Sequence, residues 1–155
     1  MIYRLWLLAH LLGVVVWVGG MVFALFALRP AVAMLEPPQR VGLMAAALGR
    51  FFNLVAWAVV LVLISGLMMM LISSGSRGMF AVPSYIHAMF GIGIAMMAIF
   101  AHIRFALYKR LTRAVEKSDW PAGAAALAGI RLWVGVNLGL GLLVIIIAVV
   151  GPGIV

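Results

Sequence analysis

The 155-residue chain is predicted to be an all-α membrane protein, a four-transmembrane-helix bundle of up-down-up-down topology. Apolar residues make up 68% of the chain and charged residues only 9%, whereas a soluble domain is about 45–50% apolar and about 25% charged. Four long apolar runs are separated by short polar segments, and one helical span needs roughly 20 residues. The length therefore accommodates four spans in a single domain, 1–155, without a soluble domain.

The four apolar runs cover about residues 5–28, 51–72, 84–107 and 129–150. The first run is longer than the roughly 7–15 apolar residues of a signal peptide, so we interpret it as a span of the mature protein. Pro37 and Pro38 end the first helix and can open a helical segment over 39–49 that leads into the second span. Capping residues Ser118 and Asp119 precede Pro121, which predicts that the fourth helix begins near Trp120.

The positions of the basic residues predict the orientation. Only Arg4 and Arg77 flank the ends of the chain and the second connection. Because Lys and Arg accumulate on the cytoplasmic side, we expect a multi-pass protein of the bacterial inner membrane with both termini in the periplasm. The basic residues lie in short loops at the bilayer surface, where anionic lipid headgroups attract them. The net charge of +8 is therefore explained without nucleic-acid binding. The nine residues that flank the first and third connections are Arg29, Arg40, Arg50, Arg104, Lys109, Arg110, Arg113, Lys117 and Arg131.

The residue types that are scarce limit the chemistry. The chain contains no cysteine, which excludes disulfides, iron–sulfur clusters and thiol catalysis. Its three carboxylates, Glu36, Glu116 and Asp119, all lie in the predicted cytoplasmic connections, so paired-carboxylate hydrolysis is not expected and no catalytic residue is assigned. A metal site within the membrane would have to use histidine, methionine or backbone oxygen.

Two histidines are predicted to lie at the same depth. His10 and His87 are each a few residues inside the outer end of a span, and these two spans run in the same direction. Gly13 and Gly91 follow one turn later on the histidine's own face and would leave room for a bulky ligand. Each histidine can instead bond a carbonyl or a water near the interface. The matched pair favours a shared role, because ionisable residues inside a membrane are costly and usually functional.

Methionines supply a second set of candidate ligands. Met68, Met69 and Met70 lie at the outer end of the second span, at the predicted depth of the two histidines. Thioether sulfur together with imidazole suits Cu(I). Three consecutive residues cover about 200° of a helix, so at most two of these side chains can face the centre. Methionine is also a frequent apolar filler of irregular cores, which is the simpler alternative.

Polar residues in the inner half of the membrane form a third candidate group. His102, Asn53 and Asn137 fall on three different spans at similar depth, and an amide there needs a partner. They are predicted to form either an interhelical hydrogen-bonded cluster or the inner end of a proton or cation path. Gly135 and Gly139 form a small-xxx-small pair that permits close packing within the bundle or in a homodimer.

Two stretches resemble a known family. The first helix reads His10-Leu-Leu-Gly-Val-Val-Val-Trp17-Val-Gly19-Gly20 and is followed by Leu28-Arg29-Pro30, and the third carries Tyr85-Ile-His87-Ala-Met89. Both resemble the CopD-like copper-resistance membrane proteins. The resemblance implies copper uptake or resistance, a periplasmic copper-binding protein as partner, and copper held on the periplasmic side by His10, His87 and nearby methionines.

The same histidine-then-Trp-Gly helix also resembles the HemJ-type protoporphyrinogen oxidases, which are four-helix membrane proteins that bind haem b. This second resemblance implies haem held by His10, and it gives the alternative function: a small b-type cytochrome with His10 and His87 as haem ligands and an electron-transfer partner. Only in that case would the protein be an enzyme, a haem-dependent membrane oxidoreductase. A third hypothesis is an accessory subunit without a ligand.

Overall fold

A computed structural model describes residues 1–75, 78 and 81–153. The described residues form helices and no strands, and the chain has four helices that are long and apolar enough to cross a membrane. The predicted all-α four-helix fold is therefore confirmed. We refer to these helices as the first to fourth spans: Ile2–Met34, Pro37–Ser74, Ser84–Glu116 and Trp120–Gly153.

Two of the spans contain π-helical turns. The first consists of α1 (Ile2–Val14), α2 (Gly20–Phe23) and α3 (Arg29–Ala31), joined by π-helical turns at Val15–Gly19 and Ala24–Leu28, and ends in a 3₁₀ turn, Val32–Met34. The third consists of α5 (Ser84–His102), a π-helical turn, Ile103–Leu107, and α6 (Tyr108–Glu116). The second span is the single helix α4 (Pro37–Ser74), and the fourth is α7 (Trp120–Val150) with a 3₁₀ turn, Gly151–Gly153.

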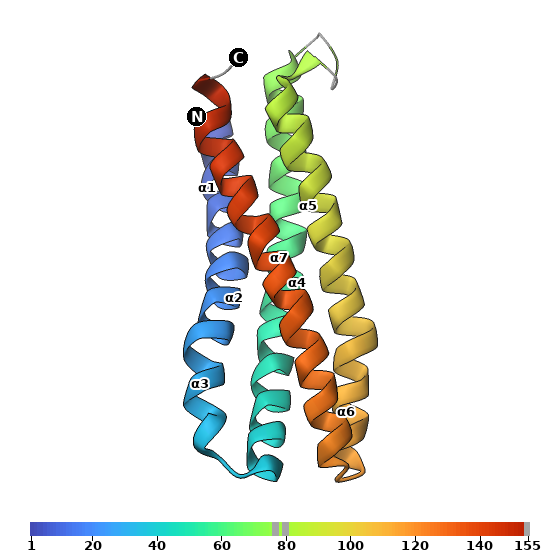
Figure 1. The fold of residues 1–155 in the computed structure, drawn as a ribbon. Helices are drawn as coiled ribbons and strands as arrows, with labels where there is room; N and C mark the ends of the chain where they lie inside the picture. The colour runs from blue at the N-terminus through green and yellow to red at the C-terminus, as the bar shows by residue number, and fades with distance from the viewer. Residues whose placement is uncertain (76–77, 79–80, 154–155) are drawn as a thin grey trace.

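The spans run alternately up and down (Figure 1). Both termini and the connection between α4 and α5 lie at one end, which we call the terminal end. The connections that follow Met34 and Glu116 lie at the other, which we call the basic end because nine of the 11 Lys and Arg residues are nearer to it along their spans. Arg77, in the terminal-end connection, lies outside the described residues.

The helices extend beyond the apolar runs at the basic end. The second span begins at Pro37 rather than near 51, and the third continues to Glu116 rather than ending near 107. An amphipathic helix can leave the apolar region because it packs one face on its neighbours while its charged face is solvated. In α6, Leu111 and Ala114 are buried whereas Lys109 and Arg110 are exposed. α7 begins at Trp120, where Asp119 Oδ1 accepts a hydrogen bond of 3.0 Å from Ala122 N.

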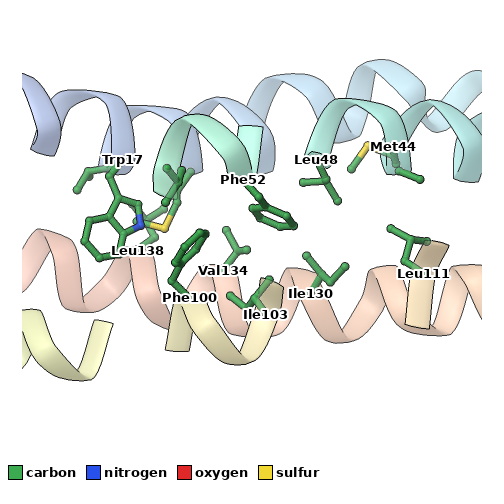
Figure 2. Packing of buried hydrophobic residues seen from close by; sticks show 14 of the residues in the cluster. Trp17, Met44, Leu48, Phe52, Phe100, Ile103, Leu111, Ile130, Val134 and Leu138 are labelled. Atoms are coloured by element: carbon green, nitrogen blue, oxygen red, sulfur yellow. The ribbon is translucent and has the colours of Figure 1, made fainter. Parts of the chain in front are cut away.

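A chain of aromatic rings crosses the centre of the bundle. Trp17, Phe100, Phe52 and Tyr108 follow one another with ring centroids 6.3, 6.2 and 5.4 Å apart, each pair in an edge-to-face arrangement. Figure 2 shows Phe52 and Phe100 between the helices, with Trp17 toward one side of the same core. Tyr108 also donates a hydrogen bond of 3.1 Å to Ala45 O. These rings tie the first, second and third spans together, and we call them the aromatic waist.

Glycines bring the first span close to α4. A methyl group at Gly13 would lie 2.6 Å from Val62 Cγ2 and 3.3 Å from Ala58 O, and one at Gly20 would overlap the ring of Phe51. Gly135 and Gly139 differ, because no described atom lies within 4 Å of a methyl group added there. They face away from the bundle, so packing within it does not explain them, and a homodimer seam stays a prediction.

Gly13→Ala should therefore destabilise the bundle. The added methyl group meets a backbone oxygen that cannot move aside, and such overpacking costs about 1–3 kcal/mol. We expect a lower midpoint of thermal unfolding in detergent, followed by tryptophan fluorescence. Gly139→Ala is the matched control and should leave the midpoint unchanged or raise it. Equal midpoints for the two variants would contradict the close contact.

Candidate functional site

A cavity of about 460 Å³ opens between the spans at the terminal end. All four spans line it, with His10 as its one histidine within the described residues. Trp17 and Met96 are both buried and lie at the side of the cavity that faces the aromatic waist. The lining is largely apolar, and its sulfur-bearing members are Met69, Met70, Met89, Met96 and Met97.

The imidazole of His10 is held against α4. Its Nδ1 lies 3.1 Å from Val62 O and 3.0 Å from Ser65 Oγ. The Ser65 side chain is fully buried, and its hydroxyl in turn donates to the carbonyl oxygen of Leu61 or of Val62. Gly66 leaves room for the ring, because a methyl group there would lie 3.3 Å from His10 Cε1.

These contacts favour one tautomer of the neutral ring. A carbonyl oxygen can only accept a hydrogen bond, so the contact between Nδ1 and Val62 O requires the proton on Nδ1. The lone pair of the neutral imidazole then resides on Nε2, for which the described residues provide no hydrogen-bond partner. Histidines that bind metals usually donate their other N–H to a carbonyl or carboxylate in this way, which fixes the tautomer and the ring orientation.

Three of the five methionines lie at the level of the predicted site. Met69 and Met70 from α4 and Met89 from α5 line the cavity, whereas Met68 does not. The geometric limit derived from the sequence, that at most two of the three consecutive methionines face the centre, describes this arrangement. Met96 and Gly141 also line the cavity, and the terminal methyl groups of Met96 and of Met21, which does not line it, both lie within 4 Å of a methyl group added at Gly141.

His87, Gly13 and Gly91 are placed differently from the expected pair of histidines beside open space. His87 is half-buried and does not line the cavity, although its neighbours Tyr85, Ile86 and Met89 do. Val62 occupies the space beside Gly13, and Gly91 is exposed on the outside of α5. Gly13 therefore serves the contact with α4 and leaves no room for a porphyrin.

The structure separates the three residues of the expected inner cluster. Asn137 is 1% exposed in the core, whereas Asn53 and His102 are exposed on outer faces of the second and third spans. The ring of His102 packs against Trp133 with centroids 5.5 Å apart. No hydrogen bond joins the three within the part of the chain that the structure describes, and there Asn137 Oδ1 is buried without a partner.

Ser65 and Gly66 are the site residues that the sequence interpretation missed. A signal existed, because Ser65 is a hydroxyl residue inside a long apolar run and Gly66 follows it directly. Within the described residues, no three His, Asp or Glu side chains gather as metal ligands. Any metal held in this cavity would therefore use the imidazole together with methionine sulfur.

Four helices that are long and apolar enough to cross a membrane, around a cavity lined by one imidazole and several thioethers, define a polytopic membrane protein. Residues 45–151, which are more than half of the chain, match the family described as Copper resistance protein D. The chain belongs to this copper resistance family, which confirms the resemblance seen in its sequence. The matched residues run from α4 to the end of the fourth span and do not include His10. Neither a curated protein nor a solved structure matches the chain.

The unpartnered amide oxygen of Asn137 should lower stability. A buried acceptor without a hydrogen bond costs about 1–3 kcal/mol, and leucine is an apolar residue of similar size. Asn137→Leu is therefore expected to raise the midpoint of thermal unfolding. The measurement is the same fluorescence melt, with Val136→Leu on the exposed face as control. A midpoint below that of the unmodified protein would show that the amide has a stabilising partner.

Proposed function

We propose that the cavity at the terminal end binds Cu(I) as the substrate of a copper-handling membrane protein, with His10 Nε2 and the thioethers of Met69, Met70 and Met89 as ligands. The observation that carries the proposal is the pair of contacts that His10 Nδ1 makes with Val62 O and Ser65 Oγ on α4. These contacts favour the tautomer with its lone pair on Nε2, in a ring that lines the same cavity as the three methionines.

The donor set favours Cu(I) over harder ions. Imidazole and thioether are soft or borderline ligands, and Mg²⁺, Ca²⁺ and Mn²⁺ prefer carboxylate, carbonyl and water oxygen. No Asp or Glu lines the cavity. A monovalent ion is also less costly to hold between apolar walls than a divalent one, because the penalty for removing a charge from water rises with that charge.

The geometry gives no support to the haem alternative with His10 and His87 as axial ligands. His87 does not line the cavity, and Val62 fills the space beside Gly13. Both features are positions of protein side chains, and neither depends on an assumed ligand. The spectrum described below tests the alternative directly.

The proposed site should weaken when its ligands are removed. In a titration of detergent-purified protein with Cu(I) against a chromophoric competitor, His10→Ala should reduce affinity by about 100-fold or more, because the single nitrogen donor is lost. Met69→Leu combined with Met89→Leu should reduce it about tenfold, in line with the 1.4 kcal/mol that each tenfold step represents.

Two other methionines provide matched controls for this titration. Met68→Leu removes a thioether adjacent in sequence that does not line the cavity, and Met34→Leu removes an exposed one at the basic end. Neither should change the affinity. An absorption spectrum of each sample, oxidised and then reduced, completes the test. A Soret band that disappears in His10→Ala would show that the ligand is haem rather than copper. Unchanged Cu(I) affinity in His10→Ala would refute the proposed site.

Removal of the Ser65 hydroxyl tests the orientation of the imidazole separately from its presence. Ser65→Ala leaves Val62 O as the one acceptor at His10 Nδ1, and outer-shell substitutions of this kind typically cost about 10–100-fold in metal affinity. We expect about a tenfold loss, at the low end, since the carbonyl remains. An affinity equal to that of the unmodified protein would show that the hydroxyl does not orient the ring.

The proposed direction of access depends on the orientation of the protein. We propose that it lies in the inner membrane with the terminal end in the periplasm, where a periplasmic copper-binding protein would deliver or receive copper. The excess of Lys and Arg at the basic end supports this orientation. A reporter enzyme active only in the periplasm should be active when fused after residue 153 and inactive when fused between 117 and 119; the reverse pattern would place the copper site on the cytoplasmic side.

A further inference from the structure

A second cavity, of about 560 Å³, opens at the basic end. It lies between the first span and α7, with α4 behind it, and no residue of the third span lines it. We call it the arginine cavity, because Arg29, Arg40 and Arg131 line it, one from each of its three helical walls. The remaining lining is apolar apart from backbone, and includes Leu25, Phe26, Met44, Leu48, Leu127 and Val134.

The charges around the arginine cavity are not compensated by the protein. The three acidic residues of the chain are Glu36, Glu116 and Asp119, and none of them lines the cavity. Within the described residues, none of its three arginines has an ion pair or hydrogen bond to another side chain. Arg104, in contrast, lies over the ring of Tyr108 at 5.2 Å. Arg29 and Arg131 are exposed and Arg40 is half-buried. Three like charges that line one space favour an anion there.

The position of the arginine cavity in the bilayer indicates where that anion lies. α4 has 38 residues, a length of about 57 Å at 1.5 Å per residue, and it exceeds a hydrocarbon core about 30 Å thick. Arg40 is near its first turn and Arg29 near the end of the first span, which puts both at the level of lipid headgroups. Arg131 is further along α7, and its long side chain can extend toward the same level.

The apolar walls extend from the arginines toward the bilayer centre. Ala24, Leu48 and Val134 line the cavity between three and eight residues beyond Arg29, Arg40 and Arg131. Phe26, on the rim, is 72% exposed. A free phosphate ion would use the guanidinium groups and leave these walls unfilled, whereas a phospholipid would place its phosphate among the arginines and an acyl chain against the walls. Basic pockets between transmembrane helices bind acidic headgroups in this way.

We propose that the arginine cavity is a binding site for one acidic phospholipid, with Arg29, Arg40 and Arg131 around its phosphate and its acyl chain between the first span and α7. The site is separate from the cavity at the terminal end and does not depend on the proposed function, because the residues that line the two cavities are entirely different.

Native mass spectrometry of the full chain in detergent tests this proposal, with dioleoyl phosphatidylglycerol as the acidic lipid and dioleoyl phosphatidylcholine as the zwitterionic reference. The unmodified protein should retain one phosphatidylglycerol in preference to phosphatidylcholine. Arg29→Gln combined with Arg131→Gln should reduce that preference about tenfold or more. Arg110→Gln combined with Arg113→Gln removes the same charge at the same end from exposed positions of α6 that do not line the cavity, and should leave the preference unchanged.

A variant that keeps all charges separates the lipid from a free anion. Ala128→Phe fills the apolar part of the cavity, because Ala128 lines it one turn from Ala124. It should reduce retention of phosphatidylglycerol, and soluble glycerol phosphate should fail to displace the lipid from the unmodified protein. If both arginine double variants lost the preference for phosphatidylglycerol equally, the effect would be one of general surface charge. Displacement of the lipid by glycerol phosphate would identify a free-anion site. Either result would overturn the proposal. A circular dichroism melt of each variant identifies loss of fold, and Ala128→Phe keeps the test decisive if the arginine pair does not fold.

Discussion

The aromatic waist is the contact on which the arrangement of the bundle depends. Trp17, Phe100 and Phe52 fix the separation of three spans at mid-height, and α7 approaches the first span at the same level, where Val18 and Met21 lie against Gly141. Protein interiors are packed too densely for such a contact to be adjusted locally. Away from it, the first span packs mainly on α4 while α7 packs mainly on the third span. Figure 1 shows α7 crossing the bundle and diverging from the first span toward the basic end. The two cavities are a consequence of this crossing.

The chemistry of the two cavities differs because different residue types are tolerated at each depth. At the terminal end the lining provides one imidazole and several thioethers. These groups cost little free energy inside a membrane, because thioethers are apolar and the imidazole is hydrogen-bonded to α4. At the basic end the lining provides three guanidinium groups, which can reach headgroups and water. Between them lies a core whose one orphaned polar atom, within the described residues, is Asn137 Oδ1. The waist therefore separates a cavity lined by one imidazole and several thioethers from one lined by three guanidinium groups.

The sequence predicts the fold reliably because length and apolarity alone decide how many times the chain crosses a bilayer. The sequence predicts His10, Met69 and Met70 at one depth, and all three line the cavity at the terminal end. Asn137, predicted in the inner half, lies near the middle of the fourth span. The sequence does not predict which way a side chain faces, because a helix that is apolar all round has no periodicity to show its buried face. For this reason the expected partners His87 and Met68 fall outside the cavity, and Asn53 and His102 face away from Asn137. The role of Ser65 is not predictable for the same reason, because its hydroxyl can contact the imidazole only if the side chain faces His10.

A handling protein has to bind copper and also release it, and the combination of ligands in the proposed site suits both requirements. The imidazole of His10 is fixed by two contacts to α4, so one bond to the metal is formed without loss of side-chain freedom. Methionine has three rotatable side-chain bonds and can follow a moving ion. One fixed donor with several mobile donors would localise Cu(I) at the cavity and still let individual thioethers exchange, whereas a cage of rigid ligands would slow its release. Met96 and Met21, beyond the first three methionines toward the waist, would extend the series of exchangeable donors inward from His10.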